Sequence, residues 1–408
     1  DAAAYRGILL ADSFAKITHA WTRQKLLPTL QARCTIGQLG GLPSQQTLTG
    51  IQILRLHGSV SKAAQLSTCT IFLDLRSAFH HLLRELVFLT SDGLTERDLE
   101  QIFNQEDFDI PALASKIAEI ISTNREDIPP GLQRFLHDIH LHTWFQLREA
   151  SDFRSGECTQ TRRGSRPGSP LADIAFNLLM AELLHDLHEA LLNNAHYVEG
   201  SSALGVTVPP VAWMDDVAIP LTTTTPEALV PLVQQITAVV HGLFRARGLT
   251  LNLDKGKTEA VLCFRGPGSD AQRLQIFDTG HQPVIVVDAD SHILSLRVVP
   301  SYKHLGAQYT MNIDVGREIR ARLGAARQAF EEMKKPLFLN KRLPVAARIQ
   351  LFQSLILSRL LYGCAVWTDV PNALIKKLET TLIAYYRQIH DIGFWNQDHV
   401  TDDSFRRA

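Results

Sequence analysis

The sequence predicts an α+β fold, in which β-strands in the middle of the chain are flanked by helical regions. Nearly continuous apolar runs at 69–75 and 211–219 have the length and composition of buried strands. Apolar residues recur at helical spacing both before and after these runs. The 408 residues are 45% hydrophobic and 20% charged, which excludes collagen-like, low-complexity and wholly disordered chains. A chain of this length is expected to form roughly two or three packed units.

Helices dominate the first half of the predicted fold. Residues 12–30 carry apolar positions at helical spacing, and we expect this helix to end at or shortly after Pro28. The remaining elements expected here are a loop at 38–43, a helix at 45–64, the strand at 69–75, a helix at 77–89, polar helical material at 92–144 with a break at Pro129 and Pro130, and a loop at 159–169 that is rich in Arg, Gly and Pro.

The second half is expected to contain most of the strands. Residues 211–219 give two β-type runs on either side of Asp215 and Asp216, which predicts a hairpin. Residues 249–264 alternate like paired strands around Lys255-Gly256. The other elements expected are an amphipathic helix at 171–193, a helix at 229–247 stopped by Gly248, a β-rich segment at 283–299, and mostly helix from 317 onward.

Charge is distributed unevenly along a chain whose formal net charge is only −1. Residues 92–127 contain ten acidic and three basic residues, whereas residues 317–359 contain ten basic and three acidic residues. Either stretch can be a solvated helix face. The alternative is that the basic stretch lies along a phosphate backbone while the acidic stretch faces away from it.

The five cysteines are far apart and include no CxxC pair, which argues against a disulfide framework and favours a reducing, intracellular compartment (nuclear or cytoplasmic). No apolar run reaches ~18 residues, so we expect no transmembrane helix and no membrane partner. No signal peptide is expected, and the chain reads as part of a longer protein.

Three aspartates are candidates for a metal site. Asp74 ends an apolar strand, where a carboxylate needs a paired charge or a cation. Asp215 and Asp216 are adjacent at the predicted turn, and a divalent cation relieves the repulsion between neighbouring carboxylates. If the hairpin lies beside the first strand, the site suits two Mg²⁺ ions ~4 Å apart, as in-line phosphoryl transfer requires. The alternative is a solvated Asp-Asp turn and an unrelated strand-end aspartate.

A histidine cluster is a rival site. His137, His140 and His142 lie within six residues, and Cys158 could add a thiolate. Zinc sites usually show a clearer Cys/His pairing or two histidines one helical turn apart, so we interpret this cluster as a polar helix face.

Seven short segments, in order over almost the whole chain, form a wider pattern. The two around the aspartates are Phe72-Leu-Asp-Leu-Arg-Ser-Ala-Phe79 and Trp213-Met-Asp-Asp216. Together they resemble the catalytic motifs of the reverse transcriptases of non-LTR (LINE-type) retrotransposons. The segments that resemble the other motifs are Arg6-Gly-Ile-Leu-Leu with Gln38-Leu-Gly-Gly-Leu, Arg163-Gly-Ser-Arg-Pro-Gly-Ser-Pro-Leu-Ala-Asp-Ile-Ala-Phe176, Gly248-Leu-Thr-Leu-Asn252 with Lys257-Thr258-Glu259, Tyr302-Lys-His-Leu-Gly306, and Leu360-Leu-Tyr-Gly-Cys-Ala-Val-Trp367.

This resemblance implies a right-hand polymerase with fingers, an antiparallel-sheet palm and a helical thumb. The domains it implies are the first part of the fingers at 1–68, a palm at 69–310 with an interleaved fingers segment at about 90–165, a thumb at 311–370, and a segment at 371–408 that leads out of the domain.

The resemblance also implies roles for single residues. Asp74, Asp215 and Asp216 would be catalytic and would hold two Mg²⁺ ions, or Mn²⁺ in their place, with the Leu75 carbonyl as a further ligand. The others would bind the deoxynucleotide (Ser77, Ala78, Phe79, Pro167, Gly168 and Lys257), grip the primer (Tyr302, Leu305 and Gly306) or contact the nucleic-acid backbone (Arg320, Arg327, Lys334, Lys335, Lys341 and Arg342).

Phe79 would lie under the sugar and exclude a 2′-hydroxyl; the alternative is an ordinary core residue. Lys257 would approach the triphosphate; the alternative is a solvated loop lysine. The chain also departs from the family pattern, with Pro167-Gly168 where Gln-Gly is usual, Ala172-Asp173 where Ser-Pro is usual, Trp213 in place of a smaller aromatic residue, and Gly41 in place of an aromatic residue.

The activity implied is addition of deoxynucleotides to a primer 3′-hydroxyl on an RNA template, with RNA, a DNA primer or target, and deoxynucleotides as partners. An endonuclease is expected outside this chain. Two alternatives stay open: a catalytically decayed nucleic-acid-binding relative and an RNA-dependent RNA polymerase. Phe79 argues against the second, since that class typically places a polar residue near the sugar.

Overall fold

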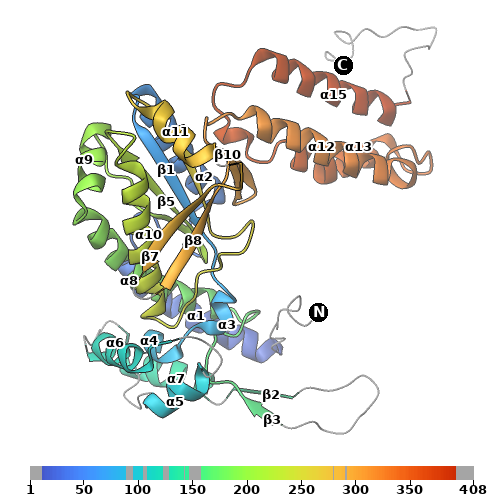
Figure 1. Cartoon of the computed structure of the whole chain (residues 1–408). Coiled ribbons are helices and arrows are strands. Elements are labelled where there is room, and N and C mark those ends of the chain that lie inside the picture. Colours follow the sequence, from blue (N-terminus) through green and yellow to red (C-terminus); the bar gives the residue numbers. More distant parts are fainter. Residues whose placement is uncertain are drawn as a thin grey trace, which may run out of the picture. The chain divides into compact units, whose positions relative to one another are not determined.

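The computed structural model describes residues 12–88, 95–103, 108–122, 128–141, 143–146, 158–278, 280–289 and 292–391. They form two compact units, of which the first ends at Leu305 and the second begins at Gly306 (Figure 1). Each unit has its own hydrophobic core. The chain is a mixed α/β protein with a mostly antiparallel sheet, which confirms the predicted class at this level.

The centre of the first unit is a six-stranded sheet in the order β4-β5-β1-β6-β8-β7. Its neighbours are antiparallel except for β6 and β8, which run parallel. β1 lies between β5 and β6, and all its residues are buried. The strands are β1 (Ser67–Leu73), β4 (Val211–Trp213), β5 (Asp216–Thr223), β6 (Glu259–Cys263), β7 (Val284–Ala289) and β8 (His292–Val298).

The two faces of β1 have different neighbours because side chains alternate along a strand. Ile71 and Leu73 belong to the main core of the first unit. Helix α10 (Leu229–Arg245) packs on β7, β1 and β5 and covers part of the sheet (Figure 1). Phe72 instead stacks on Tyr302, in β9 (Ser301–His304).

The remaining large helices pack around this sheet. Helix α1 packs on α8, α2 packs on β4 and β1, and α9 packs on β5. At the last contact Gly200 is required, because a Cβ there would lie 1.9 Å from the Thr222 carbonyl oxygen. The helices are α1 (Ser13–Arg33), α2 (Thr47–Ala63), α8 (Ala172–Leu192), α9 (Ala195–Leu204) and α11 (Ser269–Phe277).

A small helical region follows β1 in the chain. The helix expected at 77–89 is two short helices, separated by the buried residues Leu82 and Leu83, and the second contacts α6, α7 and α8. A capping box at Thr95 and Asp98 begins α5. The elements are α3 (Ala78–His81), α4 (Arg84–Phe88), α5 (Glu96–Ile102), α6 (Ile110–Ser122), α7 (Pro130–Leu141) and the paired strands β2 (Trp144–Gln146) and β3 (Cys158–Gln160).

The second unit is a helical bundle around an aromatic core. The Phe330 ring lies 4.2 Å from the ring of Tyr385 and 4.9 Å from that of Phe338, centroid to centroid, and both pairs are stacked. Its elements are β10 (Ala307–Thr310), α12 (Gly316–Met333), the π-helical turns η2 (Lys334–Phe338) and η3 (Gln353–Leu357), α13 (Val345–Phe352), α14 (Ser358–Leu360), the short 3₁₀ turn η4 (Cys364–Val366) and α15 (Asn372–Ile389).

Helix α15 packs on α12 and α13, and its residues Tyr385 and Ile389 are buried in the aromatic core. The described part of the segment expected at 371–408 is thus part of the second unit, and the domain bounds expected from the resemblance stay a prediction. Residues 392–408 lie outside the described part of the chain.

Residues Val345–Val366 form one continuous stretch that is long and apolar enough, by length and composition alone, to cross a membrane. The sequence predicted no such stretch. Its residues Phe352, Ile356 and Leu360 are fully buried in the core of the second unit.

Two local expectations differ from the structure. Helix α1 continues through Pro28 to Arg33. The strand pair expected at 249–264 does not form: only β6 is a strand, while Leu251 forms an isolated bridge with Leu75. The sequence also gave no indication of α9 and α11. Among the described side chains, Cys34, Cys69, Cys263 and Cys364 are free thiols.

Candidate functional site

Two neighbouring strands bring the first and last of the three candidate aspartates together. β1 and β5 pair antiparallel, with Leu73 opposite Val217 as the last pair. Asp74 and Asp216 occupy the next position of this register, one residue further along. Directly opposed residues of antiparallel strands have Cα atoms about 4.5–5.5 Å apart. The two carboxylates therefore extend from the same end of the sheet.

The middle aspartate lies in the turn of the predicted hairpin. β4 and β5 pair as far as Trp213 opposite Asp216, so Met214 and Asp215 are the two turn residues. Met214 has φ +58°, the left-handed backbone that two-residue hairpin turns require. The hairpin prediction is confirmed, and its geometry places Asp215 next to the Asp74–Asp216 position.

The charges of these residues influence one another. Partial burial, the Asp215 carboxylate and the Asp74 carboxylate raise the pKa of Asp216 to about 6, and the Lys257 ammonium opposes this increase. Asp216 is nevertheless an exposed residue overall, so the burial is partial. Lys257 Nζ lies 3.3 Å from Asp74 Oδ1. Two carboxylates and one ammonium group thus lie close enough to affect the ionisation of Asp216.

The donor chemistry of this site suits a hard divalent cation, because Mg²⁺ prefers carboxylate oxygens. The described residues, however, contain no group of three or more His, Cys, Asp or Glu side chains gathered closely enough to hold a metal ion. The ion pair of Asp74 is with Lys257. The site therefore has the right ligand types on paired strands, but its side chains are not arranged as a closed coordination sphere.

The backbone around Asp74 is held by residues 252 and 258, which belong to a motif identified in the sequence but whose contacts with Asp74 were not predicted. Thr258 Oγ1 accepts a hydrogen bond from Asp74 N at 3.0 Å and lies 3.2 Å from Asp74 O. Asn252 N donates to Asp74 O at 2.8 Å. Leu75 is buried and forms its bridge with Leu251, and the role of its carbonyl as a metal ligand stays a prediction.

Tyr302 lies behind the same site. Its ring stacks on Phe72, 4.4 Å away between centroids, and its hydroxyl donates to the Lys257 carbonyl at 2.7 Å. Burial, together with the carboxylates of Asp74, Asp216 and Glu259, raises the pKa of this phenol. Tyr302 therefore supports Lys257 from within the first unit.

The other predicted primer-gripping residues lie where the chain passes from one unit to the next. Leu305 and Gly306 both have left-handed backbone, with φ +48° and +79°. Their contact with a primer stays a prediction.

The predicted nucleotide-binding residues after Asp74 form a compact turn. Ser77 has left-handed backbone and precedes the short helix α3, whose first residue Ala78 is buried. The ring of Phe79 is half-buried and lies 4.7 Å from that of Phe176 on α8, centroid to centroid. Ser165 N donates to Phe79 O at 2.7 Å, which attaches the loop at 161–169 to this turn.

The loop that carries Pro167 and Gly168 is held by a buried arginine. Arg84, only 4% exposed, donates to the carbonyls of Gly164 at 2.8 Å, Thr161 at 2.9 Å and Arg163 at 2.9 Å. Gly168 itself is exposed, with φ +100°. The loop is thus anchored at its base, while the predicted nucleotide contacts of Pro167 and Gly168 stay untested.

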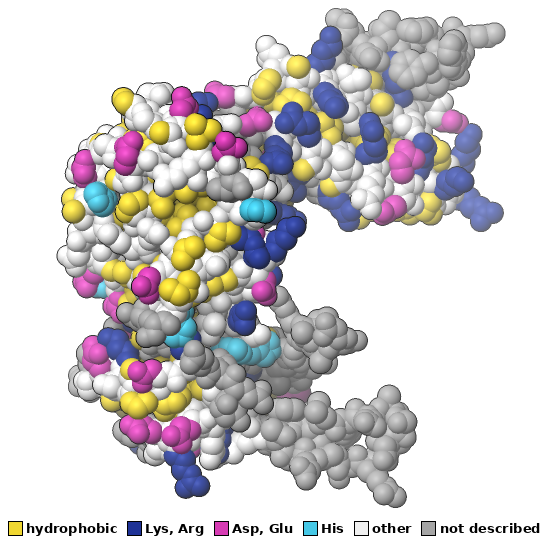
Figure 2. All heavy atoms as spheres, viewed as in Figure 1, with side chains coloured by type: hydrophobic (Ala, Val, Ile, Leu, Met, Phe, Trp, Pro, Cys, Tyr) yellow, Lys and Arg dark blue, Asp and Glu magenta, His cyan; other side chains and the backbone are white. Residues whose placement is uncertain are grey.

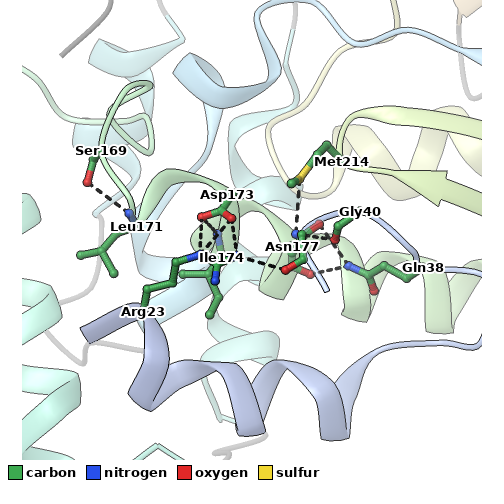
Figure 3. Close-up of polar contacts among 10 residues, drawn as sticks. Arg23, Gln38, Gly40, Ser169, Leu171, Asp173, Ile174, Asn177 and Met214 are labelled. Carbon is green, nitrogen blue, oxygen red and sulfur yellow. Dashed lines mark hydrogen bonds and ion pairs between the residues drawn. The ribbon is translucent and has the colours of Figure 1, made fainter. Parts of the chain in front are cut away.

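A second set of contacts connects the hairpin turn to α8 and to the segment around Gly40 (Figure 3). Asn177 Nδ2 donates to Gly40 O at 3.0 Å and to Met214 Sδ at 3.4 Å. Gln38 Nε2 donates to Asn177 O at 2.9 Å. Asp173, one turn earlier on α8, accepts three hydrogen bonds from Arg23.

The predicted backbone-binding residues belong to the second unit, whose surface in Figure 2 carries many Lys and Arg side chains. Arg320, Arg327 and Lys334 recur every seven residues along α12 and its continuation, which places them on one side of the helix. Lys334 pairs with Glu331 at 3.4 Å. Lys341 pairs with Asp391 at 2.7 Å. Lys335 and Arg342 are exposed.

Of the histidine cluster, the structure describes His137 and His140. His140 is buried, its Nδ1 lies 2.8 Å from the Leu136 carbonyl, and burial lowers its pKa to about 3. His142 lies outside the described residues, as do the side chain of Cys158 and the predicted motif at 6–10.

Comparisons with known proteins do not establish a family. No model of a known protein family matches the chain, and no curated protein matches it. Among solved structures it is similar to the telomerases of Candida albicans and Candida tropicalis, each solved with a fragment of telomeric RNA. Sequence identity is 11% in both cases, and the TM-scores are 0.35 and 0.42. The matches cover 94% and 92% of this chain but 52% of each telomerase, so the chain spans about half their length. Likeness at this level supports no conclusion about function.

Proposed function

We propose that this chain is an RNA-directed DNA polymerase of a retroelement, which adds deoxynucleotides to a primer 3′-hydroxyl. The observation that carries the proposal is the pairing of β1 with β5, which puts Asp74 opposite Asp216 and beside the Asp215 turn. Two Mg²⁺ ions bound by these carboxylates would activate the 3′-hydroxyl and neutralise the triphosphate.

The chain's own residues have separate roles in this proposal. Asp74, Asp215 and Asp216 hold the metal ions, and their mutual repulsion favours bound cations. Lys257 lies beside Asp74 and is close enough to neutralise a phosphate oxygen at the same place. Phe79, packed on Phe176, fills the space that a ribose 2′-hydroxyl would need.

The second unit is proposed to bind the template–primer duplex through its exposed basic residues, with RNA and DNA as the partners. An intracellular location and a separate endonuclease are part of the same proposal.

Primer extension tests the proposal. The chain is given a labelled DNA primer on an RNA or a DNA template, Mg²⁺, and either deoxynucleotides or ribonucleotides. Asp216→Asn removes a charge with little change in volume, and we expect extension to fall by several orders of magnitude. Asp288→Asn on the exposed face of β7 is the matched control and should extend normally.

Each alternative outcome identifies a different function. Equal use of ribonucleotides would identify an RNA polymerase. Binding of template–primer without extension would identify a catalytically decayed relative. Extension by Asp216→Asn at the wild-type rate would refute the metal-site assignment.

A further inference from the structure

Asn177 is a buried polar residue in the first half of α8. It is 1% exposed, and the neighbouring residues of α8 are mostly apolar core side chains. A buried amide that loses its hydrogen-bond partners costs about 1–3 kcal/mol, so its contacts determine where the side chain can point. In Figure 3 the amide points towards the segment around Gly40 and towards Met214.

The contacts of this amide reach the turn that carries the aspartates. Nδ2 donates to Gly40 O at 3.0 Å and to Met214 Sδ at 3.4 Å. Met214 is the first residue of the two-residue turn, and the second is Asp215. Asn177 therefore holds the side chain of one turn residue and a carbonyl of the segment beneath it.

That segment is in direct contact with the hairpin backbone. Leu39 N donates to Ala212 O at 2.8 Å, and Ala212 N donates to Gly37 O at 2.9 Å. A Cβ on Gly40 would lie 2.4 Å from Met214 N, and one on Gly41 would lie 2.5 Å from Asn177 Nδ2. The absence of side chains at these two positions allows the segment to lie directly against the turn.

α8 and the Gly40–Gly41 segment, which both contact the turn, are also connected to each other at a second place. Nη2 of Arg23, on α1, donates to Asp173 Oδ2 at 2.7 Å and to the Gly41 carbonyl at 3.0 Å. One guanidinium therefore connects the first turn of α8 to the Gly40–Gly41 segment. The Gly40–Gly41 segment, against which the Met214 turn lies, is therefore held by two side chains, Asn177 and Arg23.

We propose that Asn177 is a positioning residue for the metal site: by holding the Met214 turn, it sets the distance between the Asp215–Asp216 carboxylates and Asp74. This proposal rests on the proposed function, and the ligand concerned is a divalent cation. Residues that orient metal ligands without touching the metal typically change metal affinity 10- to 100-fold when they are replaced.

The test measures metal binding without catalysis. Free Mn²⁺ is quantified by electron paramagnetic resonance during titration of the whole chain, in the absence of nucleotide and nucleic acid. We expect Asn177→Ala to weaken Mn²⁺ binding about tenfold. Met214→Leu removes only the sulfur acceptor and leaves α8 intact, and we expect a smaller loss in the same direction. Thermal unfolding of each variant establishes that it is folded.

Glu182→Gln is the matched control. Glu182 is also a buried polar residue of α8, but it pairs with Arg33 of α1 at 3.5 Å. Its replacement should lower thermal stability and leave Mn²⁺ affinity unchanged.

The outcomes separate this inference from the proposed function. If wild type shows no Mn²⁺ binding, or if Asp216→Asn does not abolish the binding that it shows, the metal site itself is wrong. If wild type binds Mn²⁺ at that site and folded Asn177→Ala and Met214→Leu bind it equally well, the positioning role of Asn177 is refuted. If Glu182→Gln weakens Mn²⁺ binding as much as Asn177→Ala, the effect belongs to the general stability of α8, and the inference is likewise overturned.

Discussion

The carboxyl group of Asp216 is less stable when ionised than an ordinary aspartate. Partial burial and the carboxylates of Asp215 and Asp74 raise its pKa to about 6. Because an unfolded aspartate releases its proton near pH 4, the folded state binds more protons than the unfolded state between about pH 4 and 6. This residue therefore makes the fold less stable as the pH rises through that range.

Replacing Asp216 should consequently stabilise the fold while removing the proposed activity. At pH 7 and in the presence of a chelator, we expect Asp216→Asn to increase the free energy of unfolding, by at most about 1 kcal/mol because the residue is exposed. The gain should disappear below pH 4. Thermal unfolding at a series of pH values measures it, with Asp288→Asn as control. A lower melting temperature at pH 7 would mean that the repulsion described above is absent.

A second residue-scale prediction concerns the choice of sugar. Phe79 is half-buried against Phe176, and adding an oxygen atom to a filled space costs about 1–3 kcal/mol, tenfold or more in discrimination. Phe79→Val should raise ribonucleotide incorporation relative to deoxynucleotide incorporation about tenfold. The measurement is the ratio of the two incorporation efficiencies.

Phe277→Val makes the same chemical change on α11 in the first unit and should leave that ratio unchanged. Strong discrimination by wild type that Phe79→Val does not alter would remove Phe79 from the sugar-binding role.

At the scale of elements, the hairpin of β4 and β5 depends on a segment far away in the sequence. Its turn places Met214 in left-handed backbone, and the Gly40 segment lies against it without an intervening side chain. Such close approach of two backbones is possible only where glycine replaces a larger residue. The turn and the segment must therefore move together.

Gly40→Ala tests this dependence. The new methyl group would lie 2.4 Å from Met214 N, so the hairpin turn or the segment has to shift. We expect the free energy of unfolding to fall by about 1–3 kcal/mol and Mn²⁺ affinity to fall with it. Gly131→Ala, in a helix with no heavy atom within 4 Å of the new methyl group, should instead be neutral or slightly stabilising. Unchanged stability in Gly40→Ala would show that the close approach does not exist in solution.

The elements that the sequence predicts well are those determined by local patterns. The strand at 69–75 and the hairpin at 211–219 follow from apolar runs and an Asp-Asp turn, and both form. The hairpin expected at 249–264 fails because its first half pairs with Leu75 and Asp74, about 175 residues earlier, in place of its own neighbour.

The supporting residues of the site could not be predicted for the same reason. Asn177 and Arg84 stand among apolar helix residues, and one polar residue in such a pattern gives no indication of its partner. Their partners are separated from them in the sequence by up to 137 residues. Three catalytic aspartates can be proposed from motifs, but the residues that hold them depend on the tertiary structure.

At the scale of the whole molecule, a net charge of −1 conceals a basic stretch at 317–359, with ten basic and three acidic residues. Within it, the ion pairs of Lys334 with Glu331 and of Lys341 with Asp391 reduce the positive charge available to a polyanion. Lys335 and Arg342 are exposed, and neither forms an ion pair with another residue of the described part of the chain. These two are therefore the better candidates for contact with phosphates.

The salt dependence of binding tests whether this stretch contacts nucleic acid. The logarithm of template–primer affinity should fall linearly with the logarithm of salt concentration, with a slope of about −0.7 to −0.9 for each phosphate neutralised. Replacing both Lys335 and Arg342 by alanine should make that slope shallower by about 1.5, because two phosphate contacts are lost. Fluorescence anisotropy of a labelled duplex measures this slope between about 50 and 200 mM salt.

Replacing Lys376 and Lys377, which are exposed on α15, removes the same charge from the same unit and should change the slope less. Equal changes in the two double variants would indicate general attraction to a basic unit, and an unchanged slope in both would leave the basic stretch as a solvated helix face.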